Sequence, residues 1–214
     1  MLAFILDLDG TTADTQHVHA LIEHEILLAH DIRLDPEEIT ARFSGVSLGD
    51  MFSEIFADAG ISCPDIRTLA EEKYRRLDVI PPEQIIPIEG TVAMIHHWHT
   101  RKIPLAIGSA SQIIFIERVL HTLNIRECFK TIASSHEVAQ GKPAPDVFLL
   151  AAKRLGVDPQ ECIVVEDGVS GMIAARKAGM RCIALATNGQ RDYPADLVVD
   201  DLRKVPEEFL FVVR

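Results

Sequence analysis

The sequence predicts an α/β fold: a doubly wound, Rossmann-like parallel sheet core with an inserted α-helical cap domain. Short apolar runs bounded by turn residues alternate with segments of helical spacing, which is the pattern of βαβ units. One stretch, residues 16–85, breaks this alternation and contains only helical patterns. It is too long for an ordinary strand-to-helix connection. We therefore expect a core domain formed by residues 1–15 and 86–214 and a helical cap domain formed by residues 16–85.

Six strands are expected in the core, and their apolar runs are nearly continuous rather than alternating. The expected strands cover residues 3–9, 103–109, 130–135, 162–168, 180–187 and 195–201. Continuous apolar runs are typical of strands covered on both faces, as in a parallel sheet.

Helices are expected to follow three of these strands. Apolar residues recur at helical spacing over residues 111–124, 144–156 and 169–179. The last of these segments ends in Gly179, a residue type common just after a helix C-terminus.

Charge and composition exclude several classes of function. The formal net charge of the 214-residue chain is -11, so a phosphate backbone would be repelled and no nucleic-acid partner is expected. No apolar stretch approaches the roughly 20 residues needed to cross a bilayer, so no membrane partner is expected. The four cysteines show no CxxC spacing, and free thiols fit a reducing compartment. The sequence predicts a soluble, cytoplasmic protein and leaves its oligomeric state open.

Candidate site residues lie at the C-terminal ends of three expected strands and in the loop after a fourth, which is the end where ligands bind in open α/β sheets. They are Asp7 and Asp9, Ser109 with Ala110, Lys142, and Glu166 with Asp167. Carboxylates that crowd together repel one another and favour a cation, and an all-oxygen ligand set suits Mg²⁺. A hydroxyl, a backbone N–H at a helix start and a lysine suit phosphate oxygens. The set therefore predicts Mg²⁺-dependent phosphoryl transfer.

Four motifs in order carry a family resemblance. The stretch DLDGTTADT (7–15) resembles the first motif of the haloacid dehalogenase superfamily, and IGSAS (107–111) resembles the second. GKPAPD (141–146) resembles the third and VVEDGVSGMIAARKAG (164–179) the fourth. The helical insertion after the first motif resembles the subfamily that includes β-phosphoglucomutase and small sugar-phosphate phosphatases.

The resemblance implies a role for each matching acid. Asp7 would be the nucleophile that forms an aspartyl-phosphate, and Asp9 the general acid and then the general base. Mg²⁺ would be held by the Asp7 carboxylate, the Asp9 main-chain carbonyl and Asp167, with Glu166 bound directly or through water.

Phosphate and substrate contacts are implied in the same way. Ser109 and the Ala110 N–H would hold the transferring phosphate, and Lys142 would offset negative charge on Asp7 and on the phosphoryl group. Thr15 stands at the expected hinge between the core and the cap. His19, Ser111 and Leu48 are the candidates for the substrate side of the site.

Structural roles remain open for several of these residues. Ser109 could cap the helix that follows, Lys142 could be a solvated surface lysine, and Glu166 with Asp167 could form a turn. The stretch HHWHTRK (96–102) is interpreted as a solvated helix face with Trp98 packed inward rather than as a metal site.

The residue type at position 48 bears on the choice between the competing functions. The resemblance places Leu48 where β-phosphoglucomutases typically carry an arginine that grips a second phosphate. Arg42, Lys73, Arg75 and Arg76 lie nearby in the sequence as possible substitutes. We expect a phosphatase of small phosphorylated metabolites, with sugar phosphates as the substrates. The alternatives are a β-phosphoglucomutase-type mutase and a non-catalytic, metal-binding interaction domain.

Overall fold

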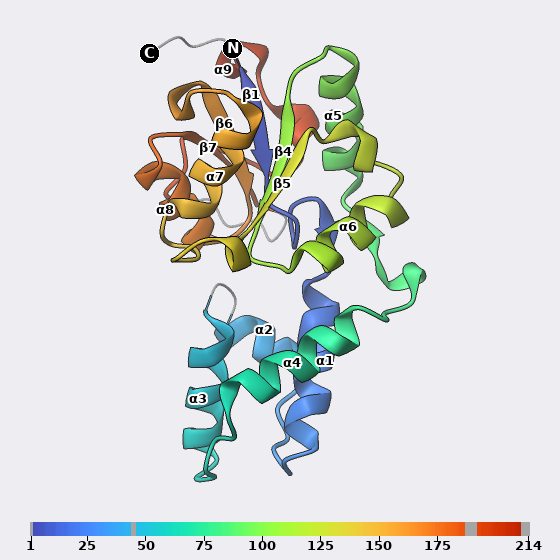
Figure 1. Ribbon diagram of the computed structural model, residues 1–214, viewed down its shortest axis with the longest axis vertical. Helices are drawn as coiled ribbons and strands as arrows, with labels where there is room; N and C mark the ends of the chain where they lie inside the picture. The colour runs from blue at the N-terminus through green and yellow to red at the C-terminus, as the bar shows by residue number, and fades with distance from the viewer. Residues whose placement is uncertain (1, 44–45, 187–191, 211–214) are drawn as a thin grey trace. The chain divides into compact units, whose positions relative to one another are not determined.

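The computed structural model describes residues 2–43, 46–186 and 192–210. Its contacts divide the chain into two compact units, one formed by Met1–Asp14 with Ile85–Arg214 and the other by Thr15–Gln84. The first unit contains the main sheet, and the second consists of helices (Figure 1).

The first unit is built on a six-stranded sheet in the order β5-β4-β1-β6-β7-β8. All five neighbouring pairs are parallel, so the expected α/β sheet is confirmed. The strands are β1 (Ala3–Leu6), β4 (Leu105–Ser109), β5 (Thr131–Ser134), β6 (Cys162–Glu166), β7 (Arg181–Leu185) and β8 (Leu197–Val199). Each is shorter than the expected run because flanking turn residues leave the ladder, and Thr187 of the expected fifth strand lies outside the described residues.

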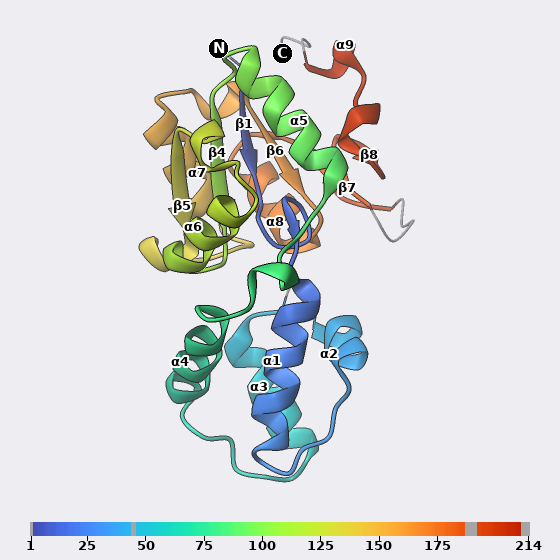
Figure 2. The same ribbon diagram turned by 90° about the vertical axis from the view of Figure 1, so that its right-hand side faces the viewer.

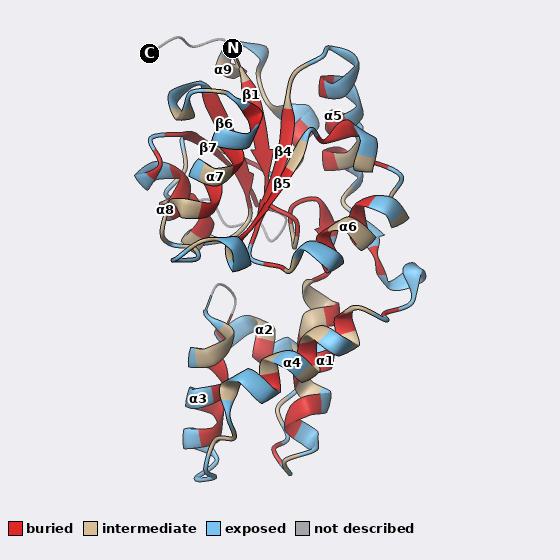
Figure 3. Ribbon diagram, viewed as in Figure 1, coloured by how far each residue is buried: buried red, intermediate tan, exposed pale blue. Residues whose placement is uncertain are grey.

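Helices cover both faces of this sheet, which accounts for the continuous apolar runs (Figure 2). Phe4 of β1 stacks on Trp98 of α5 (Glu89–Thr100), with ring centroids 3.8 Å apart. Ile5, the next residue, belongs to a buried cluster with Phe148 of α7 (Asp146–Leu155) and Met172 of α8 (Val169–Lys177). Successive residues of a strand point to opposite faces, so β1 is apolar at every position. Figure 3 shows the resulting buried strands at the centre of this unit.

Trp98 packs inward, as the sequence predicts, and is 1% exposed. His96, His97 and His99 on the same helix are exposed. The histidine-rich stretch is therefore a solvent-facing side of α5, with its indole ring in the core.

Two helix starts differ from the sequence expectation. The helix expected from residue 111 is α6 (Ile113–Thr122), because Gln112 has extended dihedral angles and forms its N-cap. Ser109 is therefore not the cap of this helix. The helix expected from residue 144 begins at Asp146, after the N-cap Pro145. Short elements complete this unit: η2 (Arg126–Cys128), η3 (Ser135–Glu137), η4 (Pro159–Glu161), η5 (Leu202–Lys204) and α9 (Glu207–Leu210).

A two-stranded ribbon, which the sequence patterns do not predict, marks where the chain leaves and re-enters the first unit. β2 (Ala13–Asp14) pairs antiparallel with β3 (Ile86–Pro87). Strands of two residues carry no periodicity, which is why they have no sequence signal. The pairing holds the two connections to the helical unit side by side.

The described residues of the helical unit form four α-helices and the short 3-10 helix η1 (Pro82–Gln84). The helices are α1 (Gln16–Leu28), α2 (Pro36–Phe43), α3 (Leu48–Asp58) and α4 (Ile66–Leu77). Each contributes buried apolar side chains, among them Ile26, Ile39, Phe52 and Leu69. None of the helices in the described part of the chain combines the length and apolarity needed to cross a membrane.

Candidate active site

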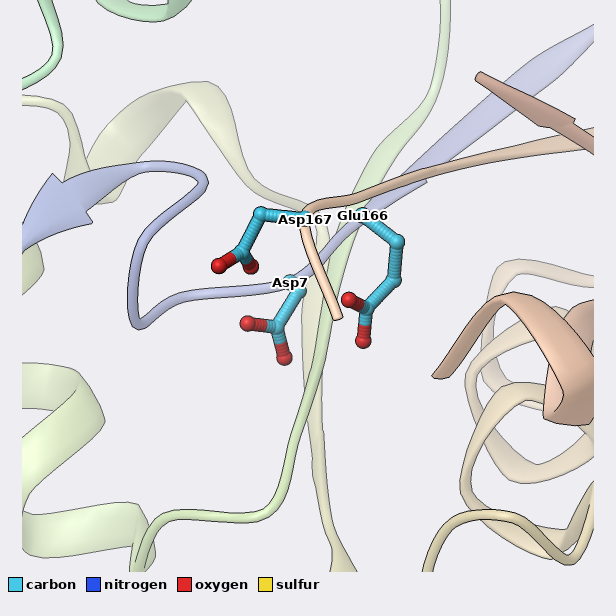
Figure 4. Close-up of side chains that lie close together, drawn as sticks. All are labelled: Asp7, Glu166 and Asp167. Carbon is cyan, nitrogen blue, oxygen red and sulfur yellow. The ribbon is translucent and has the colours of Figure 1, made fainter. Parts of the chain in front are cut away.

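Three acids gather where β1 and β6 end. These strands are neighbours, and β1 lies between β4 and β6, where the sheet order reverses direction along the chain. The Asp7 N–H donates to Val165 O over 2.9 Å, which places Asp7 beside the end of β6. Carboxylate oxygens of Asp7, Glu166 and Asp167 lie within 4.8 Å of one another (Figure 4). The fold thus brings together acids that are far apart in the sequence.

Asp9 is positioned by a turn rather than by strand alternation. The i, i+2 rule suggests that Asp7 and Asp9 share one face of a strand, but β1 ends at Leu6. Leu8 O instead accepts the N–H groups of Thr12 and Ala13, and Gly10 takes a left-handed φ of 83° that favours glycine. Strand alternation therefore does not place Asp9, because the chain enters a tight turn before Asp9 is reached.

Ser111 holds the carboxylate of Asp9. The Ser111 Oγ–H donates to Asp9 Oδ2 over 2.6 Å. The loop that carries Ser111 is itself fixed, since its N–H donates to Ser109 Oγ and its carbonyl accepts from Ser134 Oγ. Ser109 is fully buried at the end of β4, while Ala110 is exposed. The sequence motif identified Ser111, but not its contact with Asp9, which spans two strand ends.

Lys142 lies inside the acid cluster. Its Nζ donates to Asp7 Oδ1 over 2.5 Å and to Glu166 Oε1 over 2.6 Å. The side chain is only 7% exposed, so the alternative of a solvated surface lysine is wrong. Phe148 packs below it, with Nζ 4.8 Å from the ring centroid.

The acids of the fourth motif also accept hydrogen bonds. Glu166 Oε2 accepts the N–H of Gly168 over 2.7 Å, and Oε1 accepts from Lys142. Asp167 Oδ1 accepts the hydroxyl of Thr11 over 3.0 Å. Glu166 is therefore engaged with the lysine and with the start of α8, while Asp167 is tied to the turn after β1.

Two threonines of the first motif support the site. Besides the contact of Thr11 with Asp167, the buried Thr12 Oγ1 donates to the main-chain carbonyl of Asp7 over 2.7 Å. Sequence reasoning missed both contacts. The only signal was that two hydroxyl residues directly follow the Asp-Leu-Asp-Gly turn.

His19 and Leu48, the two candidates from the cap, belong to the helical unit. His19 lies in the first turn of α1, where its N–H donates to Thr15 O over 3.1 Å. Leu48 is the half-buried first residue of α3, directly after the N-cap Ser47.

Comparison with known proteins identifies the family. A model described as haloacid dehalogenase-like hydrolase matches residues 1–179. The chain belongs to this hydrolase family. It is 31% identical to fructose-1-phosphate phosphatase YqaB of Escherichia coli (strain K12), over 84% of this chain and 93% of that protein. It is 29% identical to β-phosphoglucomutase of Bacillus subtilis (strain 168), over 98% of this chain and 94% of that protein.

Solved structures share the fold of this haloacid dehalogenase-like hydrolase. The crystal structure of CbbY from Rhodobacter sphaeroides in complex with phosphate aligns with a TM-score of 0.81 at 26% identity. The alignment covers 95% of this chain and 96% of that chain. The family resemblance seen in the sequence motifs is therefore confirmed.

Acidic groups outnumber basic groups in the site of this hydrolase. Burial raises the pKa of Asp7 well above its usual value, and repulsion from Glu166 and Asp167 adds to the rise although Lys142 opposes it. Burial and the neighbouring Glu166 raise the pKa of Asp167 to about 7. Burial alone would lower the pKa of Lys142, but attraction to Asp7 and Glu166 outweighs it and raises that pKa. One lysine does not offset the surrounding acids, so the site favours a further cation.

A hard divalent cation fits this donor set. Asp7, Glu166 and Asp167 offer only carboxylate oxygens, which are the ligands that Mg²⁺ prefers. Because both oxygens of Glu166 already accept hydrogen bonds, Asp7 and Asp167 are the better placed carboxylate ligands.

Proposed function

We propose that this hydrolase is a Mg²⁺-dependent phosphatase of small sugar monophosphates, acting through an aspartyl-phosphate on Asp7. The observation that carries the proposal is the buried Asp7 carboxylate, held by Lys142 within a cluster of oxygen ligands. Fructose-1-phosphate phosphatase YqaB, the 31% identical relative, supports the substrate class.

In the first step, a carboxylate oxygen of Asp7 forms a bond to phosphorus while the bond from phosphorus to the sugar oxygen breaks. Asp9, fixed through its hydrogen bond from Ser111, donates a proton to the departing sugar oxygen. Lys142 stays charged and offsets negative charge on Asp7 and on the phosphoryl group.

In the second step, water attacks the phosphorus of the aspartyl-phosphate. Asp9, now a carboxylate, takes a proton from this water as the bond to Asp7 breaks and inorganic phosphate leaves. Mg²⁺, held by Asp7, Asp167 and the Asp9 carbonyl, would neutralise charge on the phosphoryl oxygens. Ser109 and the Ala110 N–H are the proposed phosphate contacts at the end of β4.

The pairing of the cationic side chains in the helical unit supports hydrolysis of monophosphates over a mutase reaction. A mutase must bind a second, non-reacting phosphate, and Leu48 offers it no charge. The four cations named as possible substitutes are paired with acids of the same unit: Lys73 with Glu23, Arg42 with Glu54 and Asp58, and both Arg75 and Arg76 with Glu72. A second phosphate would have to compete with these carboxylates.

A mutase remains the second candidate, because β-phosphoglucomutase of Bacillus subtilis is 29% identical over 98% of this chain. A non-catalytic metal-binding domain is disfavoured, since the acids and the lysine required for turnover are all present and lie close together.

The test is a panel of sugar monophosphates incubated with the protein and Mg²⁺, with phosphate release and isomer formation measured in the same samples. We expect phosphate release without isomerisation. Asp7→Asn should abolish both because an amide is not a competent nucleophile, and turnover within tenfold of the wild type would exclude the aspartyl-phosphate route. Faster isomer formation than phosphate release would favour the mutase.

A further inference from the structure

Gly171 lies in the first turn of α8, and the place of its missing side chain is occupied by Glu166. A Cβ atom built on Gly171 would lie 1.7 Å from Glu166 Oε1, 2.1 Å from Cδ and 2.8 Å from Cγ. The Cβ of Gly168, by contrast, would lie at an ordinary 3.4 Å from Glu166 Oε2. A side chain at position 171 would therefore clash with the carboxylate end of the buried Glu166 side chain.

Backbone geometry does not require a glycine at this position. The glycines with left-handed φ angles in the described residues are Gly10, Gly60, Gly156 and Gly179, whereas Gly171 is helical. Within a helix, glycine is less favourable than alanine. The space it leaves for Glu166 is the feature that explains it.

Glu166 uses that space to face two groups at once. Its side chain turns back onto the start of α8, where Oε2 accepts the Gly168 N–H. In the same position Oε1 accepts from Lys142, whose Nζ also donates to Asp7. Lys142 is thus held between two carboxylates, and Glu166 determines where its ammonium group lies relative to Asp7.

We propose that Gly171 is a positioning residue for Lys142. It provides the room in which Glu166 folds against α8 and holds the lysine at Asp7, a role that rests on the proposed phosphoryl transfer to Asp7. A methyl group at position 171 displaces the Glu166 carboxylate. Lys142 then keeps Asp7 as its carboxylate partner but loses the contact that orients it, while Asp7 and Asp167 remain as metal ligands.

The first experiment compares Gly171→Ala with Ser170→Ala, which adds helix propensity to the same turn without adding an atom. Lys142 acts on charge that develops during transfer, so Gly171→Ala should lower kcat by about tenfold or more while KM changes less than about threefold. Ser170→Ala should stay within about twofold of wild type. An unchanged kcat in Gly171→Ala would overturn the proposal.

A double-mutant cycle shows whether the effect passes through Glu166. Once Glu166→Ala has removed the carboxylate, adding Gly171→Ala should not lower kcat further. Kinetic losses that multiply in the double variant would contradict the proposed role.

The unfolding temperature tests the packing without any substrate. Gly171→Ala should lower it by about 2–6 °C in the presence of Glu166 and leave it equal or higher in the Glu166→Ala background. If the wild type proves to have no phosphatase activity, the proposed function fails while this reversal can still be observed. Stabilisation by Gly171→Ala in the presence of Glu166 would overturn the packing argument.

The same variants distinguish an effect on the position of Lys142 from an effect on metal binding. The Mg²⁺ concentration that gives half of the maximal thermal stabilisation should change less than about threefold in Gly171→Ala. A tenfold or larger rise would show that Glu166 serves the metal instead, and would overturn the role assigned to Gly171.

Discussion

Ser111 and Asp9 are joined by a 2.6 Å hydrogen bond, although 102 positions separate them in the sequence. The bond connects the loop after β4 with the turn after β1, and it fixes the carboxyl group that we propose as the proton donor. Because the Ser111 loop is itself held by Ser109 and Ser134, the orientation of Asp9 depends on a rigid polar support.

Ser111→Ala should therefore lower kcat by about 10- to 100-fold, the rate equivalent of losing a charge-assisted hydrogen bond of about 1.5–3 kcal/mol. Ser111→Thr keeps the hydroxyl and should retain most of the activity. Steady-state kinetics on the best sugar phosphate of the panel provides the measurement. Wild-type kcat in the alanine variant would show that Asp9 needs no such support.

Removal of metal should abolish activity and lower stability together. EDTA should stop phosphate release and Mg²⁺ should restore it, whereas Ca²⁺ should inhibit because its larger, looser coordination shell misplaces the reacting groups. At one hundred times its dissociation constant, Mg²⁺ should stabilise the folded state by about 2.7 kcal/mol, which a thermal melt detects. Asp167→Asn should lose this stabilisation, and undiminished activity in EDTA would argue against the metal site.

Leu48→Arg should raise the affinity for hexose bisphosphates. A new charge-assisted phosphate contact is worth roughly 1.5–3 kcal/mol, which corresponds to about tenfold or more in affinity. Leu48→Gln is the uncharged control and should bind bisphosphates as the wild type does. Binding is measured by calorimetry on the Asp7→Asn background, so that no ligand is consumed. Equal affinities in the arginine and glutamine variants would remove Leu48 from the explanation of substrate choice.

Glu137 should contribute stability that depends on pH. Hydrogen bonds from Arg154, at 2.8 and 2.9 Å, hold the pKa of Glu137 below its ordinary value of 4.5. A lowered folded-state pKa means that the stabilisation is complete above the unfolded-state value and is lost as the pH falls through the folded-state value. Partial exposure limits it to about 1 kcal/mol or less.

Glu137→Gln should consequently lower the unfolding temperature at pH 7 by a few degrees at most, about 2–4 °C for each kcal/mol lost. The difference from wild type should shrink as the pH falls below about 4.5. Thermal melts across pH 3–7 measure it. A constant difference at every pH would show that charge on Glu137 plays no part.

The acids of the site could be located from the sequence because they directly follow apolar runs. A short apolar run such as CIVVE, bounded by turn residues, is typical of a strand covered on both faces, and parallel strands bring their carboxyl ends to one edge. The motif resemblance placed Lys142 there and implied that it offsets charge on Asp7, but it did not indicate the contact with Glu166. Which oxygens it contacts depends on how Glu166 folds against α8, and that depends on the empty space at Gly171.

By itself, the sequence determined the strands of the main sheet, the helical insertion and the set of acids, since each leaves a local pattern of hydrophobicity or a motif of adjacent residues. Tertiary structure alone decided the β2–β3 ribbon, the bond from Ser111 to Asp9 and the packing of Glu166 over Gly171. These contacts join residues that are distant in the sequence, or depend on the absence of a side chain at Gly171. Local periodicity records which face of an element is buried, but not which polar atoms meet when separate elements come together.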